Sequence, residues 1–428
     1  MSTQNGRQEA ALTTERQSRL LFIASCIALV ATAMTFAVRG DILGTWGTEF
    51  ALDKTSVGWI TGMAFWGFAL SVIIGGAIVD FIGLKSMLVV AFATHVTGIV
   101  VTIFAGGFWT LFLGTLLIGL GNGAVEAACN PLVATAYPNQ KTAKLNLFHV
   151  WFPGGIVIGG LAAYFLTTIG LGWQVKMAII LIPTLVYGAM FLGMRIPETE
   201  RVAAGVSTGG MFREALRPMF LVLAFAMLLT ASTELGTNQW LPSILTTTAA
   251  VSGILVLVWI NGLMAVGRFF GHSFLGRISP IGLLIGSAAA SLVGLLLLSV
   301  ANSAILAFVA ATVFAVGICY FWPTMLGVTA ERFPAGGAWL LGIMGGIGNI
   351  SVAITMPILG GIYDTSGPTT ALRSMAILPL ILLLIFGFFW FRDKARGGYK
   401  AENLLEEDRG SRETEGASAG GRTAPGQV

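Results

Sequence analysis

Three polar side chains recur every four residues within a long apolar stretch of the sequence, at Asn122, Glu126 and Asn130. Residues four apart lie on one face of a helix, so the three would form a single polar stripe. A carboxylate inside a membrane is costly and by default marks a functional site. Glu126 could therefore take up a proton on one side of a membrane and release it on the other, while the amides could bind hydroxyl groups. The alternative is a structural hydrogen bond that ties this helix to a neighbour.

Two further charged residues, Arg39 and Asp41, stand in an apolar stretch near the start of the chain. Because they are two residues apart they do not share a helix face, so each is expected to find a partner on another helix. Arg39 could pair with Glu126 and oppose proton uptake until substrate or a proton breaks the pair. Asp41 is the second candidate for a proton-coupling group. The alternative for both is a static inter-helix pair or contact with an aqueous outer vestibule.

Other amides, carboxylates and aromatic rings in apolar stretches are candidates for solute contacts. Asn146 and His149 lie about one helical turn apart, and His149 could bind hydroxyl groups or be a satisfied buried histidine. Glu234 and Asn238 share a helix face. A tryptophan can stack on the apolar face of a pyranose, although tryptophans also gather at membrane interfaces. The remaining candidates for solute contacts are Gln239, Trp240, Trp259, Asn261, Trp322 and Asn349.

The composition indicates what kind of protein positions these residues. Of its 428 residues, 55% are hydrophobic and 10% are charged, whereas a soluble domain has about 25% charged residues. The chain is therefore expected to be an integral membrane protein. Its basic residues are dispersed, which argues against nucleic acid as a partner. Neither a metal-binding Cys/His spacing nor a nucleotide-binding loop is found, so no metal, no cofactor and no enzymatic activity are expected.

A membrane-spanning helix needs about 20 mostly apolar residues. The sequence predicts twelve such spans, and the expected fold is an all-α membrane protein with two pseudo-symmetric six-helix halves. The halves are expected to be related because Gly121 and Pro138 recur, 196 residues later, as Gly317 and Pro334. The predicted spans are 20–48, 55–80, 85–105, 108–137, 142–170, 173–194, 218–247, 252–276, 280–300, 304–332, 338–363 and 370–392.

Lys and Arg are concentrated in the segments that would face the cytoplasm if both termini lie there. The predicted organisation is a cytoplasmic lead (1–19), a first six-helix half (20–194), a cytoplasmic loop (195–217), a second six-helix half (218–392) and a disordered cytoplasmic tail (393–428). The protein is expected to be a monomer in the lipid bilayer of a cell membrane. Its short loops favour a bacterial inner membrane.

A short motif joins the second and third predicted spans. Gly76 and Asp80 close one span, and Gly83 and Lys85 open the next. The glycines permit a tight turn, and the charged residues could pair or cap helix ends. The motif resembles the signature loop of the major facilitator superfamily. The resemblance covers about residues 20–392 and implies alternating access between two halves.

A degenerate second copy of this motif, with Arg268 and Arg277, follows the eighth span. Within the superfamily, Phe321-Trp322-Pro323-Thr324 and Gly345-Gly346-Ile347-Gly348 resemble spans ten and eleven of the fucose–glucose–galactose permease family. Three earlier stretches are similar to the same family. They are Glu126-x-x-x-Asn130-Pro131, Leu145-Asn146-x-x-His149 with Pro153-Gly154-Gly155, and Thr233-Glu234 before Asn238-Gln239-Trp240.

The family resemblance implies proton-coupled sugar uptake with carboxylates on the first and fourth spans. Asp41 and Glu126 are the corresponding positions in this sequence. Two positions depart from the family pattern, because Arg39 stands where a neutral residue is expected and His149 where Gln is usual. Both departures concern residues that could contact the substrate.

These features predict a secondary active importer of a small polar solute, with a monosaccharide carried together with H⁺ as the favoured case. One alternative is a sodium-coupled carrier or a uniport carrier of sugar. Another is an exchanger or exporter of an organic anion or metabolite, in which Arg39 binds the anion. A transport-derived sensor or scaffold would be favoured by a large extra soluble domain, which this sequence lacks.

Overall fold

A computed structural model describes residues 2–137, 141–197, 214–270, 278–333 and 337–400, apart from the side chains of residues 2–14 and of a few others that include Asp80 and Asn146. Within this part of the chain the secondary structure is helical, without a strand. Arg277 lies outside the described residues. The predicted all-α fold is confirmed.

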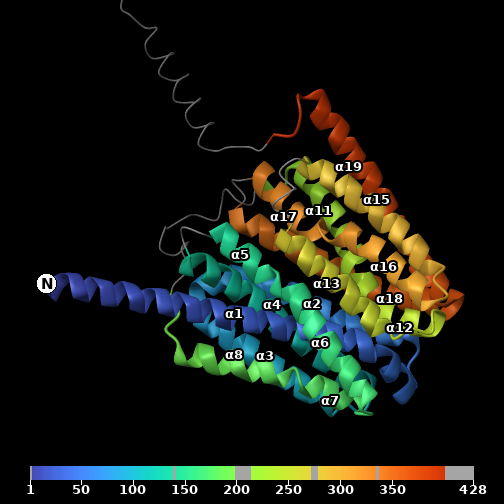
Figure 1. The fold of residues 1–428 in the computed structure, drawn as a ribbon, viewed down its shortest axis with the longest axis horizontal. Coiled ribbons are helices and arrows are strands. Elements are labelled where there is room, and N and C mark those ends of the chain that lie inside the picture. The colour runs from blue at the N-terminus through green and yellow to red at the C-terminus, as the bar shows by residue number, and fades with distance from the viewer. Residues whose placement is uncertain (1, 138–140, 198–213, 271–277, 334–336, 401–428) are drawn as a thin grey trace, which may run out of the picture.

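The first half contains six membrane crossings, of which the fifth and sixth are each divided into two helices. In Figure 1 it is drawn from blue to green. Its helices are α1 (Ser2–Glu49), α2 (Lys54–Ile82), α3 (Leu84–Ile103), α4 (Phe108–Ala136), α5 (Lys141–His149), α6 (Trp151–Thr168), α7 (Trp173–Ala178) and α8 (Leu181–Gly193).

The second half is drawn from yellow-green to red in Figure 1, and its seventh crossing contains a π-helical turn, η1. Its elements are α11 (Pro218–Ala231), η1 (Ser232–Gly236), α12 (Thr237–Thr248), α13 (Gly253–Phe270), α15 (Pro280–Ser299), α16 (Ala304–Ile318), α17 (Phe321–Arg332), α18 (Gly337–Ser374) and α19 (Ile377–Ala395).

Eleven helical segments of the described chain are long and apolar enough to cross a membrane. The last of them, Trp339–Ala395, has 57 residues, whereas one crossing needs about 20. The helix is broken inside this segment at Gly367, whose φ of 83° is in the left-handed region. The segment therefore supplies two crossings, which gives the twelve that the sequence predicts.

The first helix differs from its prediction, because α1 begins at Ser2 instead of near residue 20. The polar lead continues the helical backbone of the first crossing, and Figure 1 shows it projecting from the bundle. Pro131 lies inside α4, which continues as one helix from Phe108 to Ala136.

Small residues allow equivalent helix pairs to pack closely in both halves. A Cβ added to Gly98 would lie 2.7 Å from the backbone nitrogen of Ile118, and one added to Gly294 would lie 2.6 Å from that of Phe314. The two contacts join α3 to α4 and α15 to α16 at equivalent positions, since both residues of the pair are shifted by 196. The internal repeat is therefore present in the packing as well as in the sequence.

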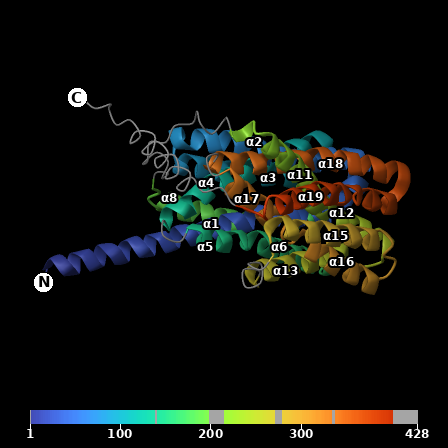
Figure 2. The ribbon, with the colours of Figure 1, turned by 90° about the horizontal axis from the view of Figure 1, so that it is seen from above.

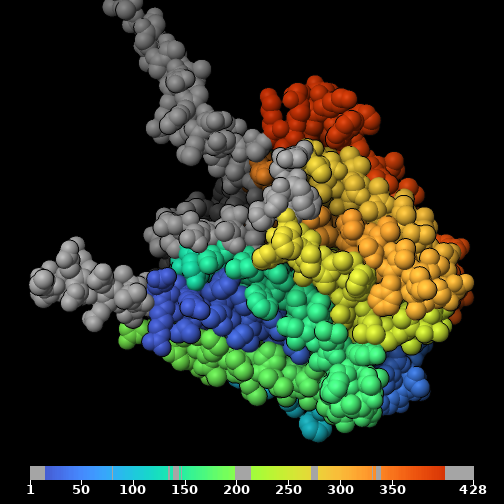
Figure 3. All heavy atoms as spheres, viewed as in Figure 1, coloured from blue at the N-terminus to red at the C-terminus, as the bar shows by residue number. Residues whose placement is uncertain are grey.

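The two halves meet along a seam that runs diagonally across Figure 3. Glycines bring α2 of the first half against α18 of the second, and Figure 2 shows the two helices along one edge of the bundle. A Cβ at Gly58 would lie 2.6 Å from the Met356 oxygen, and one at Gly62 would lie 2.7 Å from the Ala353 oxygen. Such close backbone contacts leave no room for larger side chains.

A carboxylate of the second half caps a helix of the first half at the predicted outer end of the seam. Asp364 of α18 accepts hydrogen bonds from the backbone nitrogens of Lys54 (3.0 Å) and Thr55 (2.9 Å) and from the Thr55 hydroxyl (2.8 Å). These backbone amides belong to the unsatisfied first turn of α2, which favours negative charge. Asp364 therefore holds the two halves together in the conformation described.

We predict that Asp364→Ala weakens this end of the seam. Loss of the capping hydrogen bonds at an exposed site corresponds to about 1 kcal/mol, or roughly a fivefold increase in the population in which the outer end is open. Ser243→Cys places a thiol probe where α12 faces Gly44 of α1. The rate at which a water-soluble maleimide labels this thiol should be about fivefold higher in the double variant Asp364→Ala/Ser243→Cys than in Ser243→Cys alone.

Asp53→Ala is the matched control for this experiment. Asp53 caps the same helix by accepting from the Ser56 nitrogen at 2.7 Å, but it belongs to the same half as α2. The control should lower helix stability without changing thiol labelling. Equal labelling in the two variants would show that Asp364 does not hold the seam closed.

Candidate functional site

The polar stripe on α4 begins a chain of hydrogen bonds that reaches the fifth crossing. The Asn130 amide donates to Glu126 Oε2 at 2.6 Å, and His149 Nε2 lies 3.0 Å from Asn130 Oδ1. Because an amide oxygen only accepts, Nε2 of His149 carries the hydrogen. All three side chains are partly exposed, so the chain of groups Glu126–Asn130–His149 can be reached by a solute or by water.

Asn122, the first residue of the predicted stripe, is buried and its amide is used inside the first half. Its Oδ1 lies 2.8 Å from His95 Nε2, and its Nδ2 donates to the Thr35 hydroxyl oxygen at 3.1 Å. The other His95 nitrogen lies 2.9 Å from the hydroxyl of Tyr187. This network joins α1, α3, α4 and α8, so the alternative of a structural tie describes Asn122 better than solute binding does.

The second half places an ion pair next to this region. Glu234 lies in the π-helical turn η1, and its Oε1 is 3.2 Å from the Arg268 guanidinium. Arg268 Nε also donates to the Cys319 carbonyl at 2.9 Å. Arg268 and Glu126 both act electrostatically on His149, so the ion pair and the Glu126 chain lie near one another across the seam. π-helical turns are frequent at functional sites.

Arg39 lies at a second level of the seam, towards the predicted outer end. It is 2% exposed, and its Nε donates to Gln239 Oε1 at 2.9 Å. The Gln239 nitrogen donates to the Phe36 carbonyl at 3.2 Å, which fixes the orientation of the amide. The rings of Phe36 and Phe65 have their centroids 4.9 and 5.3 Å from the guanidinium carbon. This contact joins α1 of the first half to α12 of the second.

The possible pair between Arg39 and Glu126 is not formed. Thr35 of α1 and Asn122 of α4 are hydrogen-bonded and therefore lie at one level of the bundle. Arg39 lies one helical turn from that level in one direction and Glu126 one turn in the other, because the two helices are antiparallel. The rise of a helix places the two side chains roughly 12 Å apart along the bundle axis.

Asp41, the second predicted proton-coupling group, makes an ion pair with Lys176 of α7 at 2.6 Å. The two side chains are 14% and 10% exposed. The expectation that Arg39 and Asp41 each find a partner on another helix agrees with the structure, since Arg39 binds Gln239 and Asp41 binds Lys176.

Several buried polar atoms on α1 and on the seventh crossing have no hydrogen-bond partner in the described part of the chain. A buried polar group without a partner is costly, so each such atom indicates a place for water or a ligand. Thr32 and Arg39 lie on one face of α1, two turns apart, and Glu234 and Asn238 lie on one face of the seventh crossing. The atoms are Thr32 Oγ1, Arg39 Nη2, Glu234 Oε2, Thr237 Oγ1 and Asn238 Oδ1, together with the indole nitrogens of Trp46 and Trp240.

The other predicted contact residues are dispersed. Trp240 is fully buried with its ring 5.9 Å from that of Tyr363, and Trp322 packs against Gly345 and Gly348 of α18. Trp259 is 45% exposed on the outside of the bundle and donates to the Thr312 hydroxyl.

Asn261 and Asn349 are buried, and each donates to a carbonyl one turn earlier in its own helix. Neither amide therefore needs a solute to satisfy its nitrogen. The side chain of Asn146 is not among those described, so its predicted contact with solute stays a prediction.

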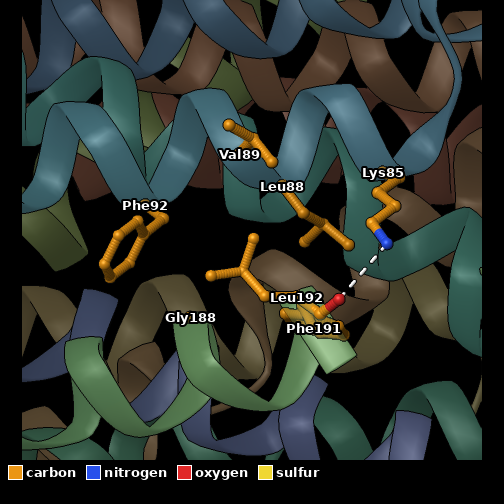
Figure 4. A pocket seen from close by; sticks show the side chains of 7 residues that line it. All are labelled: Lys85, Leu88, Val89, Phe92, Gly188, Phe191 and Leu192. Atoms are coloured by element: carbon orange, nitrogen blue, oxygen red, sulfur yellow. Dashed lines mark hydrogen bonds between the residues drawn. The ribbon is translucent and has the colours of Figure 1, made fainter. Parts of the chain in front are cut away.

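Lys85 of the loop motif caps a helix end, as the sequence analysis considered. Its ammonium group is 3.3 Å from the carbonyl oxygen of Leu192, at the carboxyl end of α8, where a positive charge is favoured (Figure 4). The same region forms a small groove between α3 and α8, lined mostly by apolar side chains. Val89 and Leu192 at this groove are exposed on the outside of the bundle, so we do not assign it to solute binding.

Gly83 of the same motif has a φ of 81° at the turn between α2 and α3. This left-handed conformation explains why the motif has a glycine there.

His95, Lys176 and the threonines of α1 are not among the residues that the sequence patterns predict. The polar face of α1 could have been found from the spacing of Thr32, Thr35 and Arg39, which repeats at three, four and seven residues. Lys176 is a lone base at the start of an apolar span, but nothing in the sequence indicates which acid it meets.

We predict that Asn122→Ala lowers stability more than it alters solute affinity. The variant leaves His95 Nε2 buried without a partner, at a cost of about 1–3 kcal/mol, while Thr35 Oγ1 loses one donor but still donates to the Thr32 carbonyl. The midpoint of thermal unfolding in detergent should therefore fall. Asn130→Ala, which removes a partly exposed amide, serves as the control and should lower it less. An Asn122→Ala protein with an unchanged midpoint and abolished transport would instead place Asn122 in the solute site.

Comparisons with known proteins agree with this architecture. The family model of the Major Facilitator Superfamily matches residues 20–339. The chain is 24% identical over 175 residues to a D-xylose transporter of Levilactobacillus brevis (40% of this chain and 36% of the relative). It is 25% identical over 240 residues to a hexuronate transporter of Bacillus subtilis (52% and 56%). The chain thus spans about a third to just over half of the length of these relatives.

Solved structures show the same fold at low sequence identity. A mutant of the nucleoside transporter NupG superposes with a TM-score of 0.73 at 13% identity, covering 87% of this chain and 99% of the other. A D-xylose-proton symporter gives 0.72 at 14% identity, with 87% and 97% covered. The family match over most of the chain, together with twelve crossings in two related halves, shows that the protein belongs to the major facilitator superfamily.

Proposed function

We propose that this transporter carries a small polyhydroxylated solute of the monosaccharide class into the cell together with a proton. The observation that carries the proposal is the set of unpartnered polar atoms on α1 and the seventh crossing, taken together with the chain Glu126–Asn130–His149. The set contains hydroxyl, amide, carboxylate and guanidinium groups. Hydroxyl groups of a sugar both donate and accept hydrogen bonds, so one such solute could satisfy members of this set together.

The location of these groups suits alternating access. Arg39 and Gln239 join the halves at one level, and the Glu126 chain and the Glu234–Arg268 pair lie near one another at another. A solute between these levels would contact both halves at once. Rocking of the halves about a midplane site would then expose the solute to each side in turn.

Glu126 is the group we assign to the proton. Its Oε2 accepts a hydrogen bond from Asn130, and Asn130 accepts one from His149 on the fifth crossing. A change of charge on Glu126 is therefore transmitted to His149. Protonation would remove a negative charge from the seam before the halves move, which lowers the cost of closing the site around it. Asp41 is bound to Lys176, so we assign it the second place.

Two of the comparisons support a sugar as the solute class. A curated relative is named a D-xylose transporter, and a structure of the same fold is titled a D-xylose-proton symporter. The distribution of basic residues supports a cell membrane location with both termini in the cytoplasm.

We predict that purified protein in liposomes accumulates a labelled monosaccharide when a pH gradient is imposed, with no requirement for Na⁺. Glu126→Gln should abolish gradient-driven accumulation but retain exchange of solute across the membrane, because the neutral amide mimics the protonated acid. Glu331→Gln is the control, since Glu331 accepts from the Tyr399 hydroxyl at the far end of α17 and lies outside the proposed site. Gradient-driven accumulation that survives in Glu126→Gln would remove Glu126 from the coupling role.

A further inference from the structure

Arg39 differs from Lys176 and Arg268 because it has no carboxylate partner. Asp41 is paired with Lys176, and Glu234 is paired with Arg268. No ion pair in the described part of the chain includes Arg39, although it is 2% exposed. A buried charge without a counter-ion is costly, so a membrane protein retains one only where it has use for it.

The guanidinium group is held in a way that leaves one end available. Its Nε is occupied by Gln239, and its faces lie near the rings of Phe36 and Phe65. Its Nη2 is buried without a hydrogen-bond partner among the described residues. The Nη1 and Nη2 atoms form the end of the planar fork that binds two oxygens of one carboxylate. The side chain is therefore oriented in advance for an anion.

The balance of charges at the seam also favours an anionic solute. When Glu126 is protonated, the two ion pairs are neutral and Arg39 contributes one unbalanced positive charge. When Glu126 is ionised, its charge lies roughly 12 Å away along the bundle axis, beyond the Asn122–Thr35 hydrogen bond. A solute with one negative charge would balance Arg39 in the proton-loaded state.

We propose that the solute is an acidic monosaccharide whose carboxylate is bound by the Nη1–Nη2 end of Arg39. The proposal rests on the transport function proposed above and makes its substrate class specific. One proton on Glu126 and one carboxylate on Arg39 enter together, so transport carries no net charge. Gln239 positions the guanidinium, and the unpartnered groups Thr32, Thr237 and Asn238 are left for the hydroxyl groups of the sugar.

D-Glucuronate and D-glucose provide a matched pair of probes, because they share the ring and differ in a carboxylate at one carbon. We expect D-glucuronate to raise the thermal unfolding midpoint of the purified protein and D-glucose to bind at least about tenfold more weakly. D-Galacturonate with D-galactose, and D-gluconate with sorbitol, extend the comparison to other stereochemistry and to open chains.

Three variants test the role of Arg39. Arg39→Met should lose the response to acidic sugars and still fold, because removing a buried charge that lacks a counter-ion offsets the loss of its hydrogen bond to Gln239. Arg39→Lys should keep a weakened response, since it retains the charge but not the fork. Gln239→Glu places a carboxylate beside Arg39 with almost no change in shape, so it should raise intrinsic stability and abolish the response to acidic sugars.

The charge carried by transport gives an independent readout. In liposomes with an imposed potassium diffusion potential, uptake of an acidic sugar with one proton should be unaffected by the potential, whereas uptake of a neutral sugar with a proton should respond to it. Binding of the acidic members that survives in Arg39→Met, or neutral members that bind as tightly as the acidic ones, would overturn this proposal and leave the transport function standing. Absence of binding and uptake for both acidic and neutral members would overturn the transport function itself.

Discussion

A polar group inside a membrane protein must find its partner within the protein or in a bound molecule, because the lipid offers none. In this structure one buried network inside the first half satisfies its members among themselves. Asn122 connects His95 and Thr35, and Tyr187 completes the network, so four helices are joined by hydrogen bonds that have no free capacity for a solute. The seam between the halves is different. Polar atoms of α1 and the seventh crossing remain unpartnered there, and they include charged groups. The first half thus contains a network that must stay rigid, whereas the seam has groups that could bind and release a solute.

The packing of the halves follows the same division. Within each half, glycines bring neighbouring helices into backbone contact, as Gly98 does against Ile118 and Gly294 against Phe314. Between the halves, α2 and α18 are also in close contact, but at the predicted outer end the connection is polar and exposed, through Asp364 and the first turn of α2. Hydrogen bonds at an exposed helix end can be exchanged for water at small cost. The halves can therefore keep their internal packing while that connection breaks and forms again.

The charged residues at the seam form a series of separate, local arrangements. Asp41 is bound to Lys176, Glu234 to Arg268, Glu126 to Asn130, and Arg39 to an amide and two aromatic rings. Arrangements of this kind allow each charge to change its partner without disturbing the others. A proton on Glu126 and an anion at Arg39 would act at different levels of the same seam. This separation gives a physical basis for coupling two species, since each neutralises a charge that the closing site would otherwise bury.

The sequence by itself determined the twelve crossings, the two related halves and the residues that are out of place in an apolar environment, because hydrophobic length, a repeat offset and an isolated charge are all local properties. It also placed Glu126 and Asn130 on one face, since helical periodicity alone decides that. Only the tertiary structure decided which partner each polar residue meets. Asn122, one turn from Glu126, faces His95, while Arg39 meets Gln239 and not Glu126. Arg268, expected in a loop motif, faces Glu234. These pairings depend on how helices far apart in sequence are rotated and offset against one another, and no periodicity within a single helix contains that information.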